Sequence, residues 1–382
     1  MEPASIDLEE HRRPMRVLHV APGNLYGGVE TLLVTLAKYR ETAPMEPEFA
    51  VCFEGRLARE LEASGVKVHR LGAARVRNPV SVLRARRRLA ALLTKSHYGA
   101  AICHMAWPQA LFGATIKAGN VPLIFWLHLA TDGRHWLERW AGLTRPAVAI
   151  CPSQFVGERL KNMYPGLAPE IIHYPIAPPA IADRDATRRQ VRAELGIADD
   201  AVVIIQASRM EPWKGQMQCL RGLAQLRDLD SWICVQAGGP QRPFERDYFE
   251  ALTKAAAELG IAERVRFLGL RNDVPRLMSA ADIYCQPNTG LEGLPIVFGE
   301  AMYAGLPIVS SRIGGFWELV DESSGILAPS DDILSLASAL RSLIESSDLR
   351  NRLGRSARDR AIAFFDPAQQ IRKLFAVVTK VR

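Results

Sequence analysis

The sequence predicts an α/β protein built from two Rossmann-like domains, and three observations support this prediction. Short apolar segments of the kind found in buried parallel strands alternate with helical segments along the whole chain. Both halves repeat this alternation at similar spacing, and the proline-containing segment 175–184 between them favours a stiff, extended connection. The length of 382 residues is enough for two domains of ordinary size. We therefore expect two doubly wound parallel sheets that face each other across a cleft.

The apolar pattern also predicts the elements of each domain. The first domain, residues 1–180, is expected to hold a helix at 79–93 and strands at 16–22, 48–53, 67–71, 101–104, 122–128 and 147–151. The second domain, residues 181–365, is expected to hold a long helix from 331 and strands at 202–207, 232–237, 265–268, 283–285 and 306–310. Asp366-Pro367 ends that long helix. A last helix is expected at 366–382.

Composition restricts the class of protein. The hydrophobic content of 48% and the charged content of 23% are typical of a globular protein in water. No apolar run approaches the roughly 18 residues of a membrane helix, and the acidic first residues lack the apolar core of a signal peptide. The six cysteines form no close Cys-x-x-Cys pair, which favours reduced thiols over a disulfide frame or a zinc site. These features predict a cytoplasmic protein.

Positive charge is concentrated in the first half of the chain. The net charge is +7, and residues 1–180 contain 22 Lys and Arg against 15 Asp and Glu. The excess gathers at Arg75, Arg77, Arg84, Arg86, Arg87 and Arg88. Such a cluster fits an anionic membrane surface or an anionic acceptor, but it also fits a solvated helix face without a partner. The sequence leaves both interpretations open, and we expect no nucleic acid partner.

The segment 283–320 carries the strongest functional signal, because it predicts a strand, a loop, a helix and a second strand. Pro295 suits the first helical position, where its missing N–H is not needed, and Gly305 can end the helix in the left-handed conformation. Glu292 lies in the loop and Glu300 within the helix, with the anion-binding N–H groups of the helix N-terminus between them. A nucleotide sugar fits this layout, because it has hydroxyl groups at both ends and a diphosphate in the middle.

Two cations follow an earlier strand of the same domain. Arg209 and Lys214 lie five residues apart after the strand at 202–207, which is typical of an anion clamp but also of two ordinary surface cations. Pro295 cannot donate a backbone hydrogen bond. Further anion contacts are therefore expected from the backbone N–H groups of Leu294, Ile296 and Val297.

Weaker signals follow strands of the first domain. Gly27 and Gly28 permit either a close backbone approach to a phosphate or a tight turn between strand and helix. His128 ends a predicted strand, where a histidine either contacts a ligand or makes a local hydrogen bond. The Asp228-Leu229-Asp230 segment precedes a strand, so we interpret it as a turn at a helix end. No cluster has metal-ligand spacing, and no metal or cofactor is expected.

The second-domain segments resemble the donor site of retaining GT-B glycosyltransferases, in particular glycosyltransferase family 4. In that family a Glu-x7-Glu pair follows a strand, and Glu292 and Glu300 match it in identity and spacing. The resemblance implies that Glu292 meets the donor sugar and that Glu300 meets the ribose. Arg209 and Lys214 match the family's Arg-x4-Lys-Gly motif for the donor phosphates.

The resemblance extends more weakly to the first domain. Gly27-Gly28-Val29-Glu30 matches a Gly-Gly-x-Glu segment that lies beside the donor diphosphate in the family, and His128 matches a histidine that contacts the donor sugar. Two departures stand out. Leu129 follows His128 where many members have Asp, and Leu294-Pro295 stands where many have an aromatic residue and glycine. In the resembled fold, the last helix crosses back to the first domain.

The resemblance also implies a reaction. A sugar would pass from a nucleotide-diphosphate-sugar donor to a saccharide or lipid-linked acceptor, in polysaccharide or glycolipid biosynthesis, with retention of configuration and without metal. His128, Arg209, Lys214 and Glu292 would form the catalytic group. The enzyme would work in the cytoplasm, either free or peripheral on the inner face of the membrane. The alternatives on the same fold are a nucleotide-sugar epimerase or phosphorylase and a non-catalytic sugar-nucleotide-binding protein.

Overall fold

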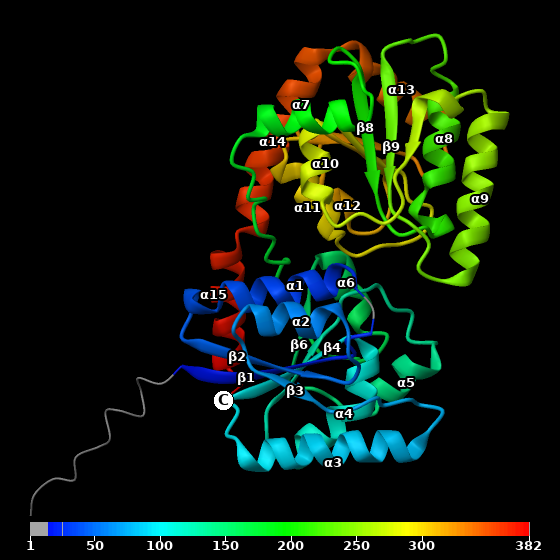
Figure 1. Cartoon of the computed structure of the whole chain (residues 1–382). Coiled ribbons are helices and arrows are strands. Elements are labelled where there is room, and N and C mark those ends of the chain that lie inside the picture. Colours follow the sequence, from blue (N-terminus) through cyan, green and yellow to red (C-terminus); the bar gives the residue numbers. More distant parts are fainter. Residues whose placement is uncertain (1–13, 25, 382) are drawn as a thin grey trace, which may run out of the picture. The chain divides into compact units, whose positions relative to one another are not determined.

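The computed structural model describes residues 14–24 and 26–381, which form two compact units (Figure 1). The first unit runs to Ala177 and also contains the chain from Phe365 onward, and the second unit is Pro178–Phe364. Each unit has its own parallel sheet with helices on both faces. The predicted fold class, α/β with two Rossmann-like sheets, is confirmed.

The first unit is built on a seven-stranded parallel sheet of order β3-β2-β1-β4-β5-β6-β7. Its strands are β1 (Met15–Ala21), β2 (Met45–Val51), β3 (Val68–Arg70), β4 (Ala100–His104), β5 (Leu123–Trp126), β6 (Val148–Cys151) and β7 (Pro169–Ile171). Its helices are α1 (Gly28–Lys38), α2 (Arg56–Ala63), α3 (Pro79–Lys95), α4 (Ala106–Ala118), α5 (Trp136–Gly142), α6 (Gln154–Leu160) and α15 (Pro367–Thr379), with a short 3-10 turn η2 (Arg40–Thr42).

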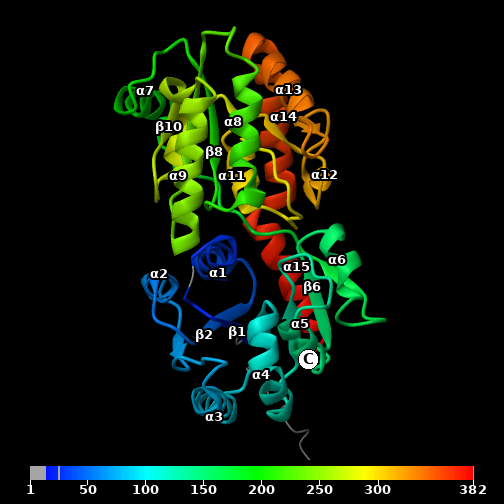
Figure 2. The same ribbon diagram turned by 90° about the vertical axis from the view of Figure 1, so that its right-hand side faces the viewer.

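The helices of the first unit cover both faces of its sheet. Helices α1 and α2 lie on one face, and α3 and α4 lie on the other (Figures 1 and 2). Strands β4 and β5 are buried along their whole length, which explains their continuous apolar sequence. Helix α3 contributes Val82, Ala85, Leu89 and Leu93 to the core, at the spacing of one helical face. Helix α15 contacts α1 and η2.

The second unit is built on a six-stranded parallel sheet of order β10-β9-β8-β11-β12-β13. Its strands are β8 (Val202–Ala207), β9 (Trp232–Ala237), β10 (Val265–Phe267), β11 (Ile283–Gln286), β12 (Ile308–Ser311) and β13 (Gly325–Ala328). Its helices are α7 (Arg184–Glu194), α8 (Gln216–Ala224), α9 (Pro243–Glu258), α10 (Val274–Ala280), α11 (Ile296–Tyr303), α12 (Phe316–Leu319), α13 (Ile333–Glu345) and α14 (Ser347–Phe365), with the 3-10 turns η3 (Pro212–Lys214) and η4 (Ala262–Arg264).

The core of the second unit lies between its sheet and helices α8, α9 and α13. Helices α7 and α10 pack against each other, and α10 also contacts α11. In the sheet order, β8 and β11 are neighbours, and the chain winds outward in opposite directions from this pair. A crevice at the carboxyl ends of such a pair is where doubly wound sheets bind ligands.

The structure differs from the sequence-based expectations in three elements. Strands β7 and β13 were not expected, because each is only three or four residues long and carries little periodic signal. The long helix from 331 is two helices, α13 and α14, separated at Ser346. Ser346 is extended, with φ −121° and ψ 103°, and its Oγ accepts a hydrogen bond from Leu349 N at 3.2 Å. A serine in this position begins a new helix instead of continuing the old one.

The arginine cluster lies on and just before α3. Arg75, Arg77, Arg84, Arg87 and Arg88 are exposed, whereas Arg86 is partly buried and donates from Nε to the Leu111 carbonyl at 2.6 Å. Two apolar residues of α3, Val80 and Leu83, are also about half exposed. Within residues 14–24 and 26–381, no helix combines the length and the apolar character needed to span a bilayer.

Candidate functional site

The loops that follow β8 and β11 place the predicted cations and carboxylates at the switch point of the second sheet. Arg209 and Lys214 follow β8, and Glu292 follows β11. The two loops are joined by a backbone hydrogen bond, in which Thr289 N donates to the Trp213 carbonyl at 2.9 Å. Gly215 has φ +77°, and a Cβ there would lie 1.9 Å from the Pro287 carbonyl oxygen. Only glycine allows this close approach.

Lys214 and Glu292 form a mostly buried ion pair across the two loops. Lys214 Nζ lies 2.5 Å from Glu292 Oε1, and the exposed fractions of the two side chains are 9% and 12%. The Lys214 ammonium lies 4.2 Å from the centre of the Trp213 ring, a favourable cation–π geometry. Gln206 holds the Lys214 carbonyl with a 2.8 Å hydrogen bond. The Lys214 ammonium group is therefore held by the Trp213 ring and the Glu292 carboxylate, and the Lys214 backbone is held by Gln206.

Arg209 is more accessible than Lys214. Its side chain is 39% exposed, and Nη2 lies 3.1 Å from Oε2 of the buried Glu211. Arg242, which precedes α9, lies 4.0 Å from the other oxygen of Glu211. Glu211 thus orients Arg209 and offsets part of its charge, while the guanidinium keeps exposed N–H groups for an incoming anion.

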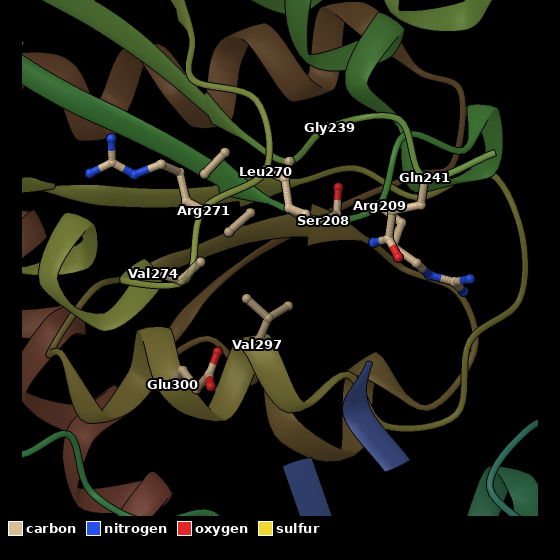
Figure 3. Close-up of a pocket in the computed structure, with 12 residues that line it drawn as sticks. Ser208, Arg209, Gly239, Gln241, Leu270, Arg271, Val274, Val297 and Glu300 are labelled. Atoms are coloured by element: carbon tan, nitrogen blue, oxygen red, sulfur yellow. The ribbon is translucent and has the colours of Figure 1, made fainter. Parts of the chain in front are cut away.

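Glu300 and Arg209 lie at opposite ends of one pocket (Figure 3). The pocket has a volume of about 180 Å³, and its lining also includes Ser208, Gly239, Gln241, Leu270, Arg271, Val274 and Val297. Val297 and Glu300 rise into it from α11, whereas the Arg271 guanidinium turns away to Asp273 and Glu194. Burial raises the pKa of Glu300 to about 7. Near neutral pH, this carboxyl group can therefore either donate or accept a hydrogen bond.

The start of α11 differs from the prediction by one residue. Pro295 is the N-cap, with ψ 121°, and Ile296 is the first helical residue. The extended conformation of Pro295 explains the shift, because a helical first residue would need a negative ψ. The helix ends at Tyr303 and Gly305 adopts φ +69°, so the predicted glycine cap is confirmed. The first N–H groups of any helix lack intrahelical acceptors, which here include those of Ile296 and Val297.

A chain of buried uncharged side chains connects β11 to Glu292. Tyr284 Oη donates to Gln286 Oε1 at 2.6 Å, Gln286 Nε2 donates to Asn288 Oδ1 at 2.9 Å, and Asn288 Nδ2 donates to Glu292 Oε2 at 2.8 Å. Tyr284, Gln286 and Asn288 are each 0% exposed. Both oxygens of Glu292 are consequently held, one by Lys214 and one by Asn288.

In the first unit, Gly27 and Gly28 begin α1 directly after the loop that follows β1. Gly27 is the N-cap, and its N–H donates to Glu30 Oε2 at 2.9 Å. Glu30 of the Gly-Gly-x-Glu segment therefore caps the N-terminus of α1. Any backbone contact from this turn to an anion would come from Gly28 and the residue after it, and not from Gly27.

His128 belongs to a buried chain of histidines at the carboxyl ends of β1, β4 and β5. His19 Nδ1 lies 3.0 Å from His104 Nε2, His104 Nδ1 lies 3.0 Å from His128 Nε2, and His128 Nδ1 lies 3.0 Å from Tyr174 Oη. Burial lowers the pKa values of His19 and His128 to about 3. The rings are therefore neutral near pH 7. Both nitrogens of His128 are engaged inside the unit, so its contact with a sugar stays a prediction.

The structure thus brings together the predicted residues of the second unit. Arg209, Lys214, Glu292, Val297 and Glu300 all border the carboxyl ends of β8 and β11. Gly27, Gly28 and His128 belong to the first unit. Asp228 pairs with Arg341, in a turn after α8 as predicted. In the described part of the chain, no three His, Cys, Asp or Glu side chains are grouped in a way that could hold a metal ion.

Comparison with known proteins assigns the chain to a family. Residues 187–360 match the model of the family described as "Glycosyl transferases group 1", and residues 26–178 match that of "Glycosyltransferase Family 4". The chain belongs to glycosyltransferase family 4. Its two parallel sheets are those of the GT-B architecture that solved glycosyltransferase structures share.

Several individual proteins resemble this family 4 chain. A D-inositol 3-phosphate glycosyltransferase of Saccharomonospora viridis is 34% identical over 189 residues, which are 47% of this chain and 43% of that protein. A GDP-mannose-dependent alpha-(1-6)-phosphatidylinositol monomannoside mannosyltransferase of Mycolicibacterium smegmatis is 35% identical over 173 residues, which are 42% of this chain and 43% of that protein. The chain therefore spans less than half the length of these two curated relatives.

A solved structure matches the fold over nearly the whole family 4 chain. Anabaena Alr3699/HepE in complex with UDP superimposes with a TM-score of 0.83 at 23% identity, covering 96% of this chain and 100% of that one. At this level of identity the likeness shows the fold alone.

Sequence reasoning missed some residues of the family 4 site. Glu211, Gln286 and Asn288 were not expected to hold the predicted charged residues. A usable signal was present for the last two, since buried strands and their ends rarely carry two amides in three residues, as Gln286 and Asn288 do.

Proposed function

We propose that this chain is a retaining glycosyltransferase that moves a sugar from a nucleotide-diphosphate-sugar donor to a saccharide or lipid-linked acceptor. The observation that carries the proposal is the grouping of two cations and two carboxylates around one helix N-terminus at the switch point of the second sheet. Arg209 and Lys214 lie on one loop, and Glu292 and Glu300 lie before and within α11. This arrangement suits an anion flanked by hydroxyl-bearing rings.

The chemical difficulty in the reaction is the departure of a nucleoside diphosphate, on which negative charge develops. Arg209, Lys214 and the N–H groups of Leu294, Ile296 and Val297 would stabilise that charge, as preorganised donors do in other enzymes. These protein donors would serve in place of a metal. We propose that attack occurs on the face from which the leaving group departs, so that configuration is retained without a protein nucleophile.

The carboxylates would hold the two rings of the donor. Glu300 would accept a hydrogen bond from a ribose hydroxyl, and its pKa of about 7 makes that interaction dependent on pH. Glu292 would meet the donor sugar. Gly28 and His128 of the first unit would contribute near the diphosphate and the sugar, respectively. Solved structures of Anabaena Alr3699/HepE with UDP-glucose and with UDP and glucose support the expectation of a nucleotide-sugar donor.

A transfer assay tests this proposal. The full-length chain would be incubated with a panel of nucleotide sugars and saccharide or polyprenyl-phosphate acceptors, with and without a chelator. We expect transfer with retained configuration that the chelator leaves intact. We also expect Lys214→Ala to lower kcat/KM by more than about tenfold, the loss typical of one charged transition-state contact. An unchanged kcat/KM for this variant would reject the phosphate role of Lys214.

The alternatives predict other outcomes of the same assay. A nucleotide-sugar epimerase consumes or converts the donor when no acceptor is added, whereas a phosphorylase needs inorganic phosphate. A non-catalytic binding protein would bind the donor without turnover. Intact Arg209, Lys214, Glu292 and Glu300 favour the transferase, because a protein that only binds has no need for charge-stabilising groups at the leaving phosphate.

We further propose that α3 attaches the protein to an anionic membrane. Val80, Leu83, Arg84 and Arg87 are exposed and lie at the i, i+3, i+4 and i+7 positions of one helical stripe. Such a stripe of apolar and cationic side chains is typical of a helix at a membrane surface. The names of the relatives that act on a phosphatidylinositol mannoside or an inositol phosphate are consistent with a lipid-linked or anionic acceptor.

Liposome sedimentation tests the membrane proposal. We expect binding to vesicles containing anionic lipid and not to neutral vesicles, and we expect an Arg84→Glu/Arg87→Glu variant to lose it. Arg352→Glu/Arg355→Glu, on the exposed side of α14, is the matched control because it makes the same change of charge elsewhere. Equal sedimentation with both vesicle types, or equal loss in both variants, would reject the proposal.

A further inference from the structure

Glu292 is held by a chain of hydrogen bonds that begins inside the second sheet. Tyr284, Gln286 and Asn288 lie on β11 and directly after it, all fully buried, and each donates to the next toward Glu292. Tyr284 Oη is also within 3.2 Å of the Ala207 carbonyl at the end of β8. Ser310 of β12 donates to the Gln286 carbonyl at 2.7 Å. The chain is therefore anchored to three neighbouring strands.

The chemistry of the groups fixes the direction of every bond in this chain. An ionised carboxylate only accepts hydrogen bonds, so Asn288 must present its NH2 group to Glu292. The Asn288 oxygen then accepts from Gln286, and the Gln286 oxygen in turn accepts from the Tyr284 hydroxyl. Burial raises the pKa of Tyr284 well above its ordinary value, so the phenol stays protonated as this arrangement requires. Rotating either amide group by half a turn would place two acceptor oxygen atoms opposite each other.

We propose that Asn288, supported by Gln286 and Tyr284, is the positioning residue that orients the Glu292 carboxylate for the donor sugar. This inference rests on the proposed function. Lys214 holds Glu292 Oε1, and it is also the cation that a donor phosphate would attract. When Lys214 turns toward that phosphate, the bond from Asn288 keeps Glu292 in place. A buried amide suits this task, because it carries no charge that would compete for the phosphate and has its rotamer fixed by its own partners.

The Asn288→Asp variant tests the proposal, because it keeps the shape of the side chain and removes the donor. The measurement is the dissociation constant of a nucleotide sugar and of the matching nucleoside diphosphate, by calorimetry. We expect the nucleotide sugar to bind about tenfold or more weakly, the loss typical of one hydrogen bond to a charged group. The nucleoside diphosphate, which has no sugar for Glu292, should be weakened severalfold less than the nucleotide sugar, because the charge that Asp adds acts on both ligands alike. If Asn288 only stabilised the fold, its substitution would weaken the binding of both ligands to the same extent.

A pH series supplies a rescue that a structural role would not show. At low pH the introduced carboxyl group can protonate and donate to Glu292, while its other oxygen still accepts from Gln286. The charged and titratable groups around Glu292 are Lys214, the un-ionised Tyr284 phenol and Glu300. Because burial raises the pKa of Glu300 to about 7, it titrates in this range in both proteins, so the variant is compared with wild type at each pH. We expect the deficit of Asn288→Asp relative to wild type to shrink as the pH falls over this range.

Three further variants separate the positioning chain from the general effect of placing an acid in the protein interior. Gln286→Glu removes a donor two bonds away from Glu292, so we expect it to weaken the nucleotide sugar selectively as well. Gln109→Glu is the matched control, since Gln109 is equally buried but donates to the Thr144 carbonyl and to Tyr164 in the first unit. In a Glu292→Ala background, Asn288→Asp should have no further effect on the nucleotide sugar.

The outcomes distinguish this inference from the proposed function. Equal weakening of both ligands by Asn288→Asp, or no weakening of either, would overturn the positioning role while leaving donor binding by the wild type intact. Selective weakening by Gln109→Glu to the same extent would overturn it too. Failure of the wild-type chain to bind any nucleotide sugar would overturn the proposed function and this inference together.

Discussion

Breaking the Lys214–Glu292 pair should lower the free energy of unfolding by an amount that can be worked out from the structure. The two charges lie 2.5 Å apart and are about nine-tenths buried. Removing one partner from a buried pair leaves the other without compensation, at a cost of about 3–5 kcal/mol. We expect Lys214→Met to lie near the lower limit, about 3 kcal/mol, because methionine keeps the apolar stem and Asn288 still donates to Glu292.

The assay is thermal and urea unfolding of four proteins: the wild type, Lys214→Met, Glu292→Gln and the double variant. A loss of about 3 kcal/mol corresponds to a fall in Tm of roughly 6–12 °C for a unit of this size. We expect each single variant to be destabilised, and the double variant to be more stable than the sum of the single effects by at least about 1.5 kcal/mol. Additive effects would refute the reasoning, because they would mean that the two charges do not stabilise each other.

The remaining predictions concern protonation and backbone geometry. Because a ribose hydroxyl donates a stronger hydrogen bond to the ionised form of Glu300 than to the protonated form, nucleotide-sugar affinity should fall as the pH drops from 8 to 6. Glu300→Gln should remove this dependence in calorimetry; a pH dependence that persists in this variant would mean that another group causes it. His19 and His104 are neutral in the folded chain, with pKa values held below the ordinary 6.5 by burial, so the folded state binds fewer protons than the unfolded one. Stability should therefore be fully present above about pH 6.5 and decline below it, by about 1.4 kcal/mol per pH unit for each such ring in urea titrations; a flat profile would contradict the neutral chain. Gly215→Ala should destabilise the second unit by more than about 2 kcal/mol and abolish donor binding, because its Cβ would overlap the Pro287 carbonyl; a folded variant that binds the donor would show that the loops can separate.

Much of the fold followed from the sequence because a parallel sheet imposes a simple pattern on it. Strands buried on both faces are continuous apolar runs, and β8 and β9 were predicted at their observed limits, Val202–Ala207 and Trp232–Ala237. Short edge strands such as β7 and β13 lack that pattern, and their pairing depends on neighbours that are distant in sequence. The division between α13 and α14 depends on one N-terminal cap, the Ser346 side chain, which the apolar periodicity of the sequence does not reveal.

The candidate site was predictable only where its residues lie close together in sequence. Arg209 with Lys214, and Glu292 with Glu300, could be paired by spacing, but the ion pair between Lys214 and Glu292 joins residues 78 apart. The partner of Arg209 was missed because Glu211 lies within the same motif and resembles an ordinary surface acid.

The histidine chain shows a second kind of limit. His128 was identified by its place at a strand end, which says nothing of where its ring nitrogens point. His104 and Tyr174 occupy both of them, and they come from elements separated from His128 by 24 and 46 residues. Side-chain partners of this kind depend on which strands and segments become neighbours in the fold, and the sequence around one strand does not identify those neighbours.

The most direct test of the central claim is a thermal-shift titration of the wild type and an Arg209→Ala/Lys214→Ala variant with nucleoside diphosphates and their sugars. A ligand that binds only the folded chain raises its Tm. The account predicts that at least one nucleotide sugar raises the Tm of the wild type, and that this shift disappears in the variant even after its lower starting Tm is taken into account. A shift of equal size in both proteins would place the diphosphate elsewhere and contradict the account.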